Sequence, residues 1–342
     1  MTLNNKKVRL DYIDICKALS IYLVVLGHSP LCNNSIKQFI YAFHMPVFFV
    51  TYGFVCATRM AKQNEPFSLS FVFKKFKRLM VPYYIWAFTY TVFTKNLTWK
   101  TALLILWGSQ TGLKMAGSLT SLWFLPCMFM STCIFQILVC ISSKYKNRIA
   151  SLLLVLSTAI LSLVLPKFEY GYFCGTDAAL MGTLFSLIGL YAAPVFKTIR
   201  KKNNYIKLII AIVCIVLCTL LNHYNLQYIP INNADMPSGN YGLVYIYIMA
   251  AIMGNVSIIV ISMLLENMDN LWVRNNIIKM GQNTLIVLVL HKPLVTWLSN
   301  EVAVVGFGNM LSCLVVSLVV CCFASFFSEP IKHYIPWSVG NL

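Results

Sequence analysis

The chain has 342 residues, of which 59% are hydrophobic, more apolar surface than one water-soluble core can bury. Lys and Arg number 27 and Asp and Glu 10, which gives a net charge of +17. No basic stripe with interleaved aromatics, helix-turn-helix or zinc-finger spacing accompanies that charge, so nucleic acid is excluded as the expected partner. The twelve cysteines are scattered through apolar segments, and neither a disulfide framework nor a metal site is expected.

Apolar segments long enough to cross a bilayer follow one another along the chain and predict an all-α integral membrane protein, a bundle of about ten transmembrane helices. The predicted spans are residues 11–31, 38–58, 79–94, 119–141, 149–166, 174–196, 205–222, 241–265, 282–299 and 307–327. No repeat or separable soluble region interrupts them. Residues 1–342 are therefore predicted to form a single transmembrane domain.

The basic residues between the spans predict the orientation of the chain. Segments assigned to the inside hold twenty Lys and Arg residues, whereas loops assigned to the outside hold five. Because basic loops stay in the cytoplasm, both termini are predicted to be cytoplasmic. The longest outward loop, Asn222 to Asn240, carries no charge except Asp235 and contains turn residues, which is typical of an ordered cap or lid.

The first predicted span carries three ionisable residues, each of which costs roughly 2.5–3.5 kcal/mol at membrane depth. Lys17 and His28 lie eleven positions apart and therefore fall within roughly 20° of one helix face, with Asp14 about 40° to the other side. This pattern predicts a polar stripe about 16 Å long. An ion pair of Asp14 with Lys17 at the inner interface is an equally good explanation for those two residues. Gly27 before His28 and Ser29-Pro30 after it predict a helix end at His28, where a side chain can face a cavity.

Further polar residues recur at the same predicted depth, in the outer half of the membrane. His44 lies about two turns into the second span, Asp177 is early in the sixth, and Asn240 opens the eighth. Two histidines at matched depth on consecutive spans favour a proton-transfer site over two isolated packing contacts. Asp177 needs a donor and could orient an imidazole. Trp123 joins this level, although it could also be an interfacial belt residue.

His291 lies in the middle of the ninth span, directly before Lys292-Pro293. A packing or kink role for this histidine and a chemical role are equally supported by the sequence.

Together these residues resemble the type 3 family of membrane acyltransferases, in particular its bacterial fucose 4-O-acetylase-like branch, over nearly the whole chain. The resemblance rests on Arg9 to Lys17 with Leu26-Gly27-His28, Phe43-His44-Met45-Pro46, Lys77-Arg78-Leu79, Trp123-Phe124-Leu125, Asp177-Ala178-Ala179 and Leu290-His291. Lys17 departs from the family, where many members have an arginine, and keeps the charge without bidentate geometry.

The resemblance implies an O-acetyltransferase that spans the bacterial inner membrane and contacts membrane lipid. It would move an acetyl group from cytoplasmic acetyl-CoA to a hydroxyl of a cell-surface or lipid-linked glycan. His28 is the expected base, and His44 is expected to stabilise the oxyanion or hold the acceptor, with Asp177 as the third catalytic residue. The expected substrate-binding residues are Trp123, Asn240, Asp14 and His291, and the expected coenzyme A contacts are Lys17 and Arg78. The alternative is a secondary transporter or flippase of a glycan or small polar substrate.

Overall fold

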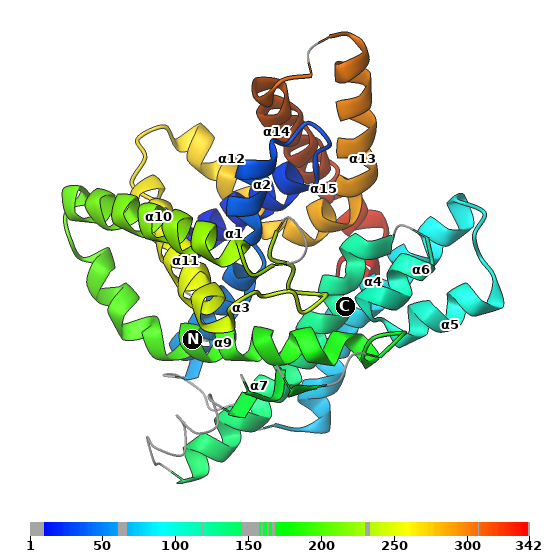
Figure 1. Ribbon diagram of the computed structural model, residues 1–342, viewed down its shortest axis with the longest axis horizontal. Coiled ribbons are helices and arrows are strands. Elements are labelled where there is room, and N and C mark those ends of the chain that lie inside the picture. Colours follow the sequence, from blue (N-terminus) through cyan, green and yellow to red (C-terminus); the bar gives the residue numbers. More distant parts are fainter. Residues whose placement is uncertain are drawn as a thin grey trace, which may run out of the picture.

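The computed structural model describes residues 10–60, 67–117, 119–145, 157–158, 160–162, 164–165, 168–229, 233–306 and 308–340. Throughout these residues the regular elements are helices, and an isolated bridge between Asp235 and Asn240 is the extended pairing (Figure 1). The helices are α1 (Asp11–His28), α2 (Asn34–Tyr41), α3 (Pro46–Met60), α4 (Leu69–Phe93), α5 (Trp99–Trp107), α6 (Gln110–Met115), η1 (Leu119–Trp123), α7 (Phe124–Tyr145), η2 (Phe173–Gly175), α9 (Thr176–Arg200), α10 (Asn204–Leu226), α11 (Val244–Leu265), α12 (Leu271–Gln282), α13 (Thr284–Val304), α14 (Met310–Phe326), α15 (Ser328–Tyr334) and η3 (Pro336–Val339).

Seven helical stretches of the described residues are long and apolar enough to cross a membrane, which confirms the helical membrane class. They are Asn34–Thr58, Leu119–Ser142, Phe173–Arg200, Asn204–Leu226, Val244–Leu265, Thr284–Val304 and Met310–Tyr334. Two more predicted spans are helical as well: the one in α1 carries three charged side chains, and the one in α4 follows four basic residues of the same helix. The predicted span 149–166 lies largely outside the described residues. A total of ten spans and the side of each terminus therefore stay predictions.

Three boundaries differ from the sequence prediction. α4 begins at Leu69, ten residues before the predicted span, so the basic run Lys74 to Arg78 lies on a helix. His44 was predicted two turns inside a continuous helix, but it lies in a turn at 42–45 between α2 and α3. Pro46 begins α3 because its fixed φ suits the first helical position and its missing N–H costs nothing there. Asn240 was predicted to open the eighth span, whereas α11 begins only at Val244.

α1 lies at the centre of the bundle, in contact with α2, α3, α11, α12, α13 and α14. α5 and α6 lie at one side of the molecule, α13 and α14 at another, and α10 at a third (Figure 1). A central helix has little access to lipid. Its polar residues can therefore reach other helices in place of hydrocarbon, which is the condition for keeping ionisable groups in a membrane protein.

α3 and α9 approach each other closely through paired glycines. A Cβ atom on Gly53 would lie 1.8 Å from the carbonyl oxygen of Ser186, and one on Gly189 would lie 2.0 Å from that of Val50. Both distances are far below contact, so only glycine fits at these positions. Small residues are the usual device for close helix packing in membranes, where lipid offers no hydrophobic drive between helices.

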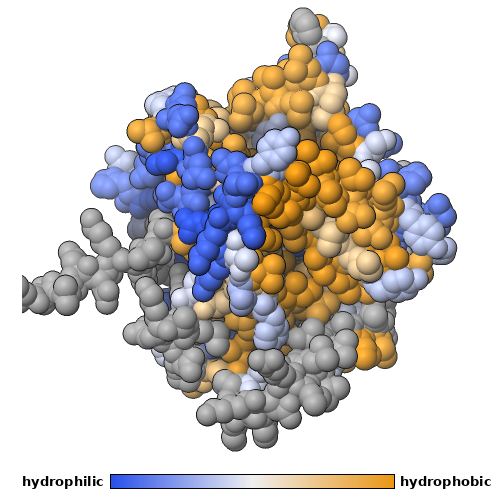
Figure 2. Space-filling model, turned by 90° about the vertical axis from the view of Figure 1, so that its left-hand side faces the viewer, coloured by the Kyte–Doolittle hydropathy of each residue, from blue (hydrophilic) through white to orange (hydrophobic). Residues whose placement is uncertain are grey.

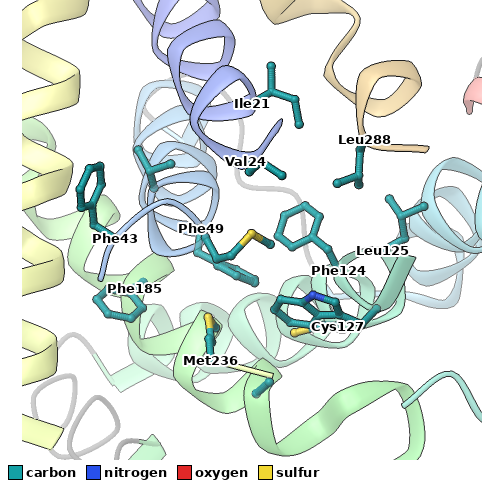
Figure 3. Packing of buried hydrophobic residues seen from close by; sticks show 14 of the residues in the cluster. Ile21, Val24, Phe43, Phe49, Phe124, Leu125, Cys127, Phe185, Met236 and Leu288 are labelled. Atoms are coloured by element: carbon teal, nitrogen blue, oxygen red, sulfur yellow. The ribbon is translucent and has the colours of Figure 1, made fainter. Parts of the chain in front are cut away.

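The main part of the core is a continuous apolar cluster that joins α1, α3, α4, α7, α9, α11 and α13, beside two smaller clusters. Side chains of α1, α7 and α13 meet there, with Ile21, Val24, Phe124 and Leu288 facing one another (Figure 3). Met236, which belongs to the connection between α10 and α11, is part of the same cluster. This connection therefore packs into the protein instead of extending into solvent, as expected for an ordered cap.

The outer surface carries apolar side chains where lipid would lie. Figure 2 shows a broad hydrophobic face beside a strongly hydrophilic one. α10 exposes most of its apolar side chains, including Leu208, Ile212 and Leu220, and α14 exposes Leu311 and Val315. In water such a surface would drive aggregation, whereas in a bilayer it is the expected outer layer of the bundle.

Candidate active site

Three of the five histidines of the chain lie together inside the bundle. The rings of His28 and His291 meet edge to face, with centroids 5.1 Å apart. The ring of Tyr41 lies 6.2 Å from that of His28 and 4.8 Å from that of His44. The structure thus brings together residues from α1, α2, the 42–45 turn and α13. The matched depth of His28 and His44 concerned these two residues alone, and the position of His291 beside His28 was not predicted.

Each of the three imidazoles is tied to the backbone of its own segment by the same ring nitrogen. Nδ1 of His28 lies 2.7 Å from the carbonyl oxygen of Val24, and Nδ1 of His44 lies 2.9 Å from that of Ile40. Nδ1 of His291 lies 2.7 Å from the carbonyl oxygen of Leu288. Because a carbonyl only accepts, each Nδ1 carries the proton, which leaves each Nε2 with a lone pair when the ring is neutral.

Helix α13 is shaped locally by Pro293. Proline has no N–H, so the carbonyl of Val289 lacks its usual helical donor, and the hydroxyl of Tyr90 on α4 donates to it instead. His291 is completely buried, and its Nε2 has no hydrogen-bond partner within the described structure. The carbonyl that Pro293 leaves without a helical donor is therefore satisfied without His291, so Pro293 does not explain the buried Nε2 of His291.

A cation stands next to this group. Lys292 follows His291 in α13, and its ammonium donates to the hydroxyl of Thr120 in η1. It is also close enough to His28 to interact with it electrostatically. Lys292 was not among the predicted site residues, although its position next to a mid-span histidine was the signal that could have assigned it to the site.

The connection between α10 and α11 covers this region with Asp235. The Asp235 carboxylate interacts electrostatically with Tyr41, the residue between His28 and His44. Burial raises the pKa of Asp235, while hydrogen bonds from Ser238 and the charge of Lys114 act in the opposite direction. Within the connection, the Ser238 hydroxyl donates to the Asp235 carboxylate and accepts from the side-chain amide of Asn240 at 2.8 Å. Asn240, a predicted substrate-binding residue, therefore stabilises the turn that positions Asp235.

Asp177 lies in the first turn of α9, where the helix dipole favours a carboxylate. It lines a cavity of about 170 Å³ together with Thr111, Tyr172, Ser238 and Tyr241. Its electrostatic partners include Tyr241 and Cys127. The predicted role of Asp177 in orienting an imidazole stays a prediction.

Trp123 ends η1 and is buried in the core cluster, with its ring 6.1 Å from that of Phe124. This position argues against an interfacial belt residue, which would face the headgroup region. Its predicted contact with substrate stays a prediction.

The two predicted coenzyme A contacts, Lys17 and Arg78, differ in burial and in charge pairing, and Asp14 is the predicted substrate-binding residue beside Lys17. Asp14 is almost completely buried and forms an ion pair with the half-buried Lys17, with 2.9 Å between carboxylate oxygen and ammonium nitrogen. The ion pair that the sequence left open is therefore present, and it partly neutralises Lys17. Arg78 is exposed on α4. Among the residues that the structure describes, no three His, Cys, Asp or Glu side chains are grouped so as to hold a metal ion.

Comparison with known proteins places the chain in a family. Searches of curated proteins and of solved structures found no match. The family model described as an acyltransferase domain matches residues 10–327, nearly the whole chain and all of the residues that form the histidine cluster. That match favours an enzyme over the transporter alternative, while the fucose 4-O-acetylase-like branch stays a prediction. The chain belongs to the acyltransferase 3 family and is a membrane acyltransferase.

Proposed function

We propose that the protein is an O-acetyltransferase of the bacterial inner membrane, which moves an acetyl group from cytoplasmic acetyl-CoA to a hydroxyl of a cell-surface or lipid-linked glycan. The observation that carries this proposal is the cluster of His28, His44 and His291, in which every Nδ1 is bonded to a backbone carbonyl. Such a cluster presents Nε2 lone pairs in a water-poor interior, where proton transfer is expected to be directed by geometry.

His28 is the proposed general base. Its Nε2 accepts the proton of the acceptor hydroxyl while the oxygen attacks the thioester carbonyl carbon, which forms a tetrahedral intermediate. The C–S bond then breaks, the acetyl group stays on the acceptor oxygen, and the coenzyme A sulfur takes up the proton that His28 holds. His28 is half-buried, whereas His44 and His291 are almost fully buried, so His28 has the best access for a polar acceptor.

The developing oxyanion needs donors or a positive charge close to the reacting carbon. Lys292 supplies a fixed positive charge near His28, and its bond to Thr120 orients the ammonium. We assign oxyanion stabilisation to Lys292, while the Nε2 lone pair of His44 is proposed to hold the acceptor by accepting a hydrogen bond from one of its hydroxyl groups. Tyr41, between His28 and His44, holds the two rings at a fixed separation.

The donor reaches this group from the cytoplasmic side along α1. Asp14 and Lys17 lie near the start of the helix and His28 at its end, with eleven residues or about 16 Å of helix rise between Lys17 and His28. Coenzyme A phosphates are proposed to bind the exposed Arg78 and Lys17. Lys17 would then share its ammonium between a phosphate and the Asp14 carboxylate. The thioester arm then extends along the polar face of α1 toward His28.

The experiment is a comparison of surface glycans from intact and gene-deleted cells by mass spectrometry. Loss of one acetyl mass per repeating unit in the deletion strain, restored by the intact gene, is the expected result. Unchanged glycan mass, together with no consumption of acetyl-CoA by the purified protein, would refute the proposal and favour the transporter alternative.

A further inference from the structure

Two cysteines from opposite ends of the sequence meet beside the end of α1. Cys32 lies in the connection between α1 and α2, and Cys313 is the fourth residue of α14. With Leu26 and Ile40 they form one small cluster of buried residues, separate from the main core. The two thiols also hydrogen-bond to each other. The packing of α1 against α14 creates this pair, which the spacing of the cysteines along the chain does not reveal.

Other contacts hold the two backbones next to each other at this point. The hydroxyl of Tyr22 on α1 donates to the carbonyl of Leu314, the residue after Cys313, at 3.2 Å. The Cys32 thiol donates to the carbonyl of Asn33 at 3.6 Å, which orients the Cys32 side chain. The proximity of the two sulfur atoms is therefore supported by contacts on both sides of the pair.

The pair is close to the geometry that a disulfide bond requires. A disulfide needs sulfur atoms about 2.05 Å apart and Cα atoms no more than about 7 Å apart. Two thiols in hydrogen-bond contact approach that arrangement, and rotation about one χ1 angle is the movement that remains. Cysteines that only fill space in an apolar interior need no contact between their thiols.

A second pair of cysteines provides an internal comparison. Cys127 of α7 and Cys174 of η2 interact electrostatically, but both side chains are completely buried. Cys32 keeps 9% of its surface exposed. Thiol–disulfide exchange begins with attack by an accessible thiol. Cys32 is therefore the thiol that an oxidant can reach, whereas Cys127 and Cys174 are expected to stay reduced.

The predicted orientation of the chain places the pair in an oxidising compartment. The charge pattern assigns both the α1–α2 connection and the start of α14 to the outside of the membrane. The contact of Cys32 with Cys313 agrees with that pattern, because it brings both segments to the same side of the bundle. Outside the bacterial cytoplasm, disulfides form and persist.

We propose that Cys32 and Cys313 form a disulfide bond, which fixes the end of α1 to the start of α14. The oxidant is itself a disulfide, carried by a thiol–disulfide oxidoreductase or by oxidised glutathione. The Cys32 thiolate attacks one sulfur of this oxidant, and the other sulfur leaves as a thiol. The Cys313 thiolate then attacks the Cys32 sulfur and displaces the second oxidant sulfur as a thiol. Two protons and two electrons thus pass from the protein to the oxidant.

The bond would lie four residues after His28, the proposed base. Ser29, next to His28, is already tied to Ser299 of α13 by a hydrogen bond of 3.0 Å between the hydroxyl groups. A covalent link to α14 would give the same end of α1 a second attachment. The inference goes beyond the proposed function and does not depend on it, because the bond is detected without acyl transfer.

Peptide mass spectrometry of the full-length protein tests the inference. Cells are lysed and denatured in N-ethylmaleimide, which blocks free thiols, and the purified protein is digested without reducing agent. We expect a peptide that joins Cys32 to Cys313 in most molecules, while Cys127 and Cys174 carry N-ethylmaleimide. Recovery of Cys32 and Cys313 as blocked thiols, or a bond of either residue to another cysteine, would overturn the inference.

A second measurement tests whether the bond forms again after reduction. The purified protein is reduced with dithiothreitol and then incubated for hours with oxidised glutathione. Burial raises the pKa of Cys32 to about 11, so little thiolate is present and the exchange is slow. We expect the same linked peptide to return. A linked peptide that appears only in this measurement would also overturn the inference, because the thiols would then stay reduced in the cell.

Variants assign the effect of the bond on stability. Reduction should lower the apparent melting temperature of the wild-type protein by about 3–10 °C, because the open chain regains conformational freedom. C32A and C313A should show no effect of the reductant. C322A changes an exposed cysteine of α14 and should keep the full shift. An equal shift in wild type and C32A would contradict the inference. If C313A does not fold, C32A and the peptide measurement on wild type still decide.

Discussion

Replacing His291 by Leu separates a chemical role of this residue from a structural one. The side chain is completely buried, and its Nε2 lacks a partner, so removing that atom relieves a desolvation penalty of about 1–3 kcal/mol. The change also removes the 2.7 Å bond from Nδ1 to the Leu288 carbonyl, which contributes about 0.5–1.5 kcal/mol. The two effects nearly cancel, and the stability of H291L should lie within about 1–2 kcal/mol of wild type.

Activity should respond very differently. The His291 ring packs against that of the proposed base His28, with centroids 5.1 Å apart, so its loss is expected to misplace the base and to reduce the acyl transfer rate, by at most the about 100- to 10,000-fold that a general base contributes. The assay is acetyl transfer from labelled acetyl-CoA, measured beside the apparent melting temperature in the same detergent. H223L, which changes an exposed histidine on α10, is the control. A large fall in melting temperature with near-normal turnover of the folded fraction would refute the reasoning.

Three further predictions follow from other parts of the molecule. G189A should reduce stability by about 1–3 kcal/mol and lower the folded yield, because the new Cβ would lie 2.0 Å from the Val50 carbonyl oxygen. G308A, with nothing nearer than 3.9 Å, is the control, and equal melting temperatures would contradict the α3–α9 contact. R78A should weaken acetyl-CoA binding about two- to fivefold, because an exposed charge pair contributes up to about 1 kcal/mol. K201A should have no effect, and an unchanged dissociation constant for R78A would remove it from the site. D235N should show a stability advantage over wild type that grows as the pH rises. The pKa of Asp235 is raised by burial above its usual 3.8, so its stabilising protonated form is complete below that value and lost as the pH rises through the raised pKa. A melting-temperature difference that is constant from pH 4 to 7 would contradict this.

The sequence predicted helix identity well because lipid imposes a single solution on long apolar segments. It also predicted the end of α1 at His28, where Gly27, Ser29 and Pro30 act locally. The break at 42–45 could not be predicted in the same way. It depends on how α2 packs over α1, whereas hydropathy continues unbroken through Phe43 and Val47. The start of α4 was missed because charged residues lower hydropathy without preventing a helix.

The candidate site was predictable in part, for a similar reason. Ionisable residues at membrane depth are rare, so His28, His44 and His291 stood out as single positions. Their sequence neighbours did not reveal which of them meet. The contact of His28 with His291 joins residues 263 positions apart through the packing of α1 against α13, and the position of Tyr41 depends on the turn after α2. Tyr41 was missed as a site residue because only tertiary structure places it beside His28. Lys292 was missed as well, although it directly follows a mid-span histidine in the sequence.

The most direct test of the account is transfer of labelled acetyl from acetyl-CoA by purified H28A, compared with wild type at equal folded protein. If His28 is the base, turnover should fall about 100- to 10,000-fold while the protein still inserts in the membrane and still binds acetyl-CoA. Near-normal turnover by H28A would contradict the account, because no other group in the cluster combines a free Nε2 with comparable exposure.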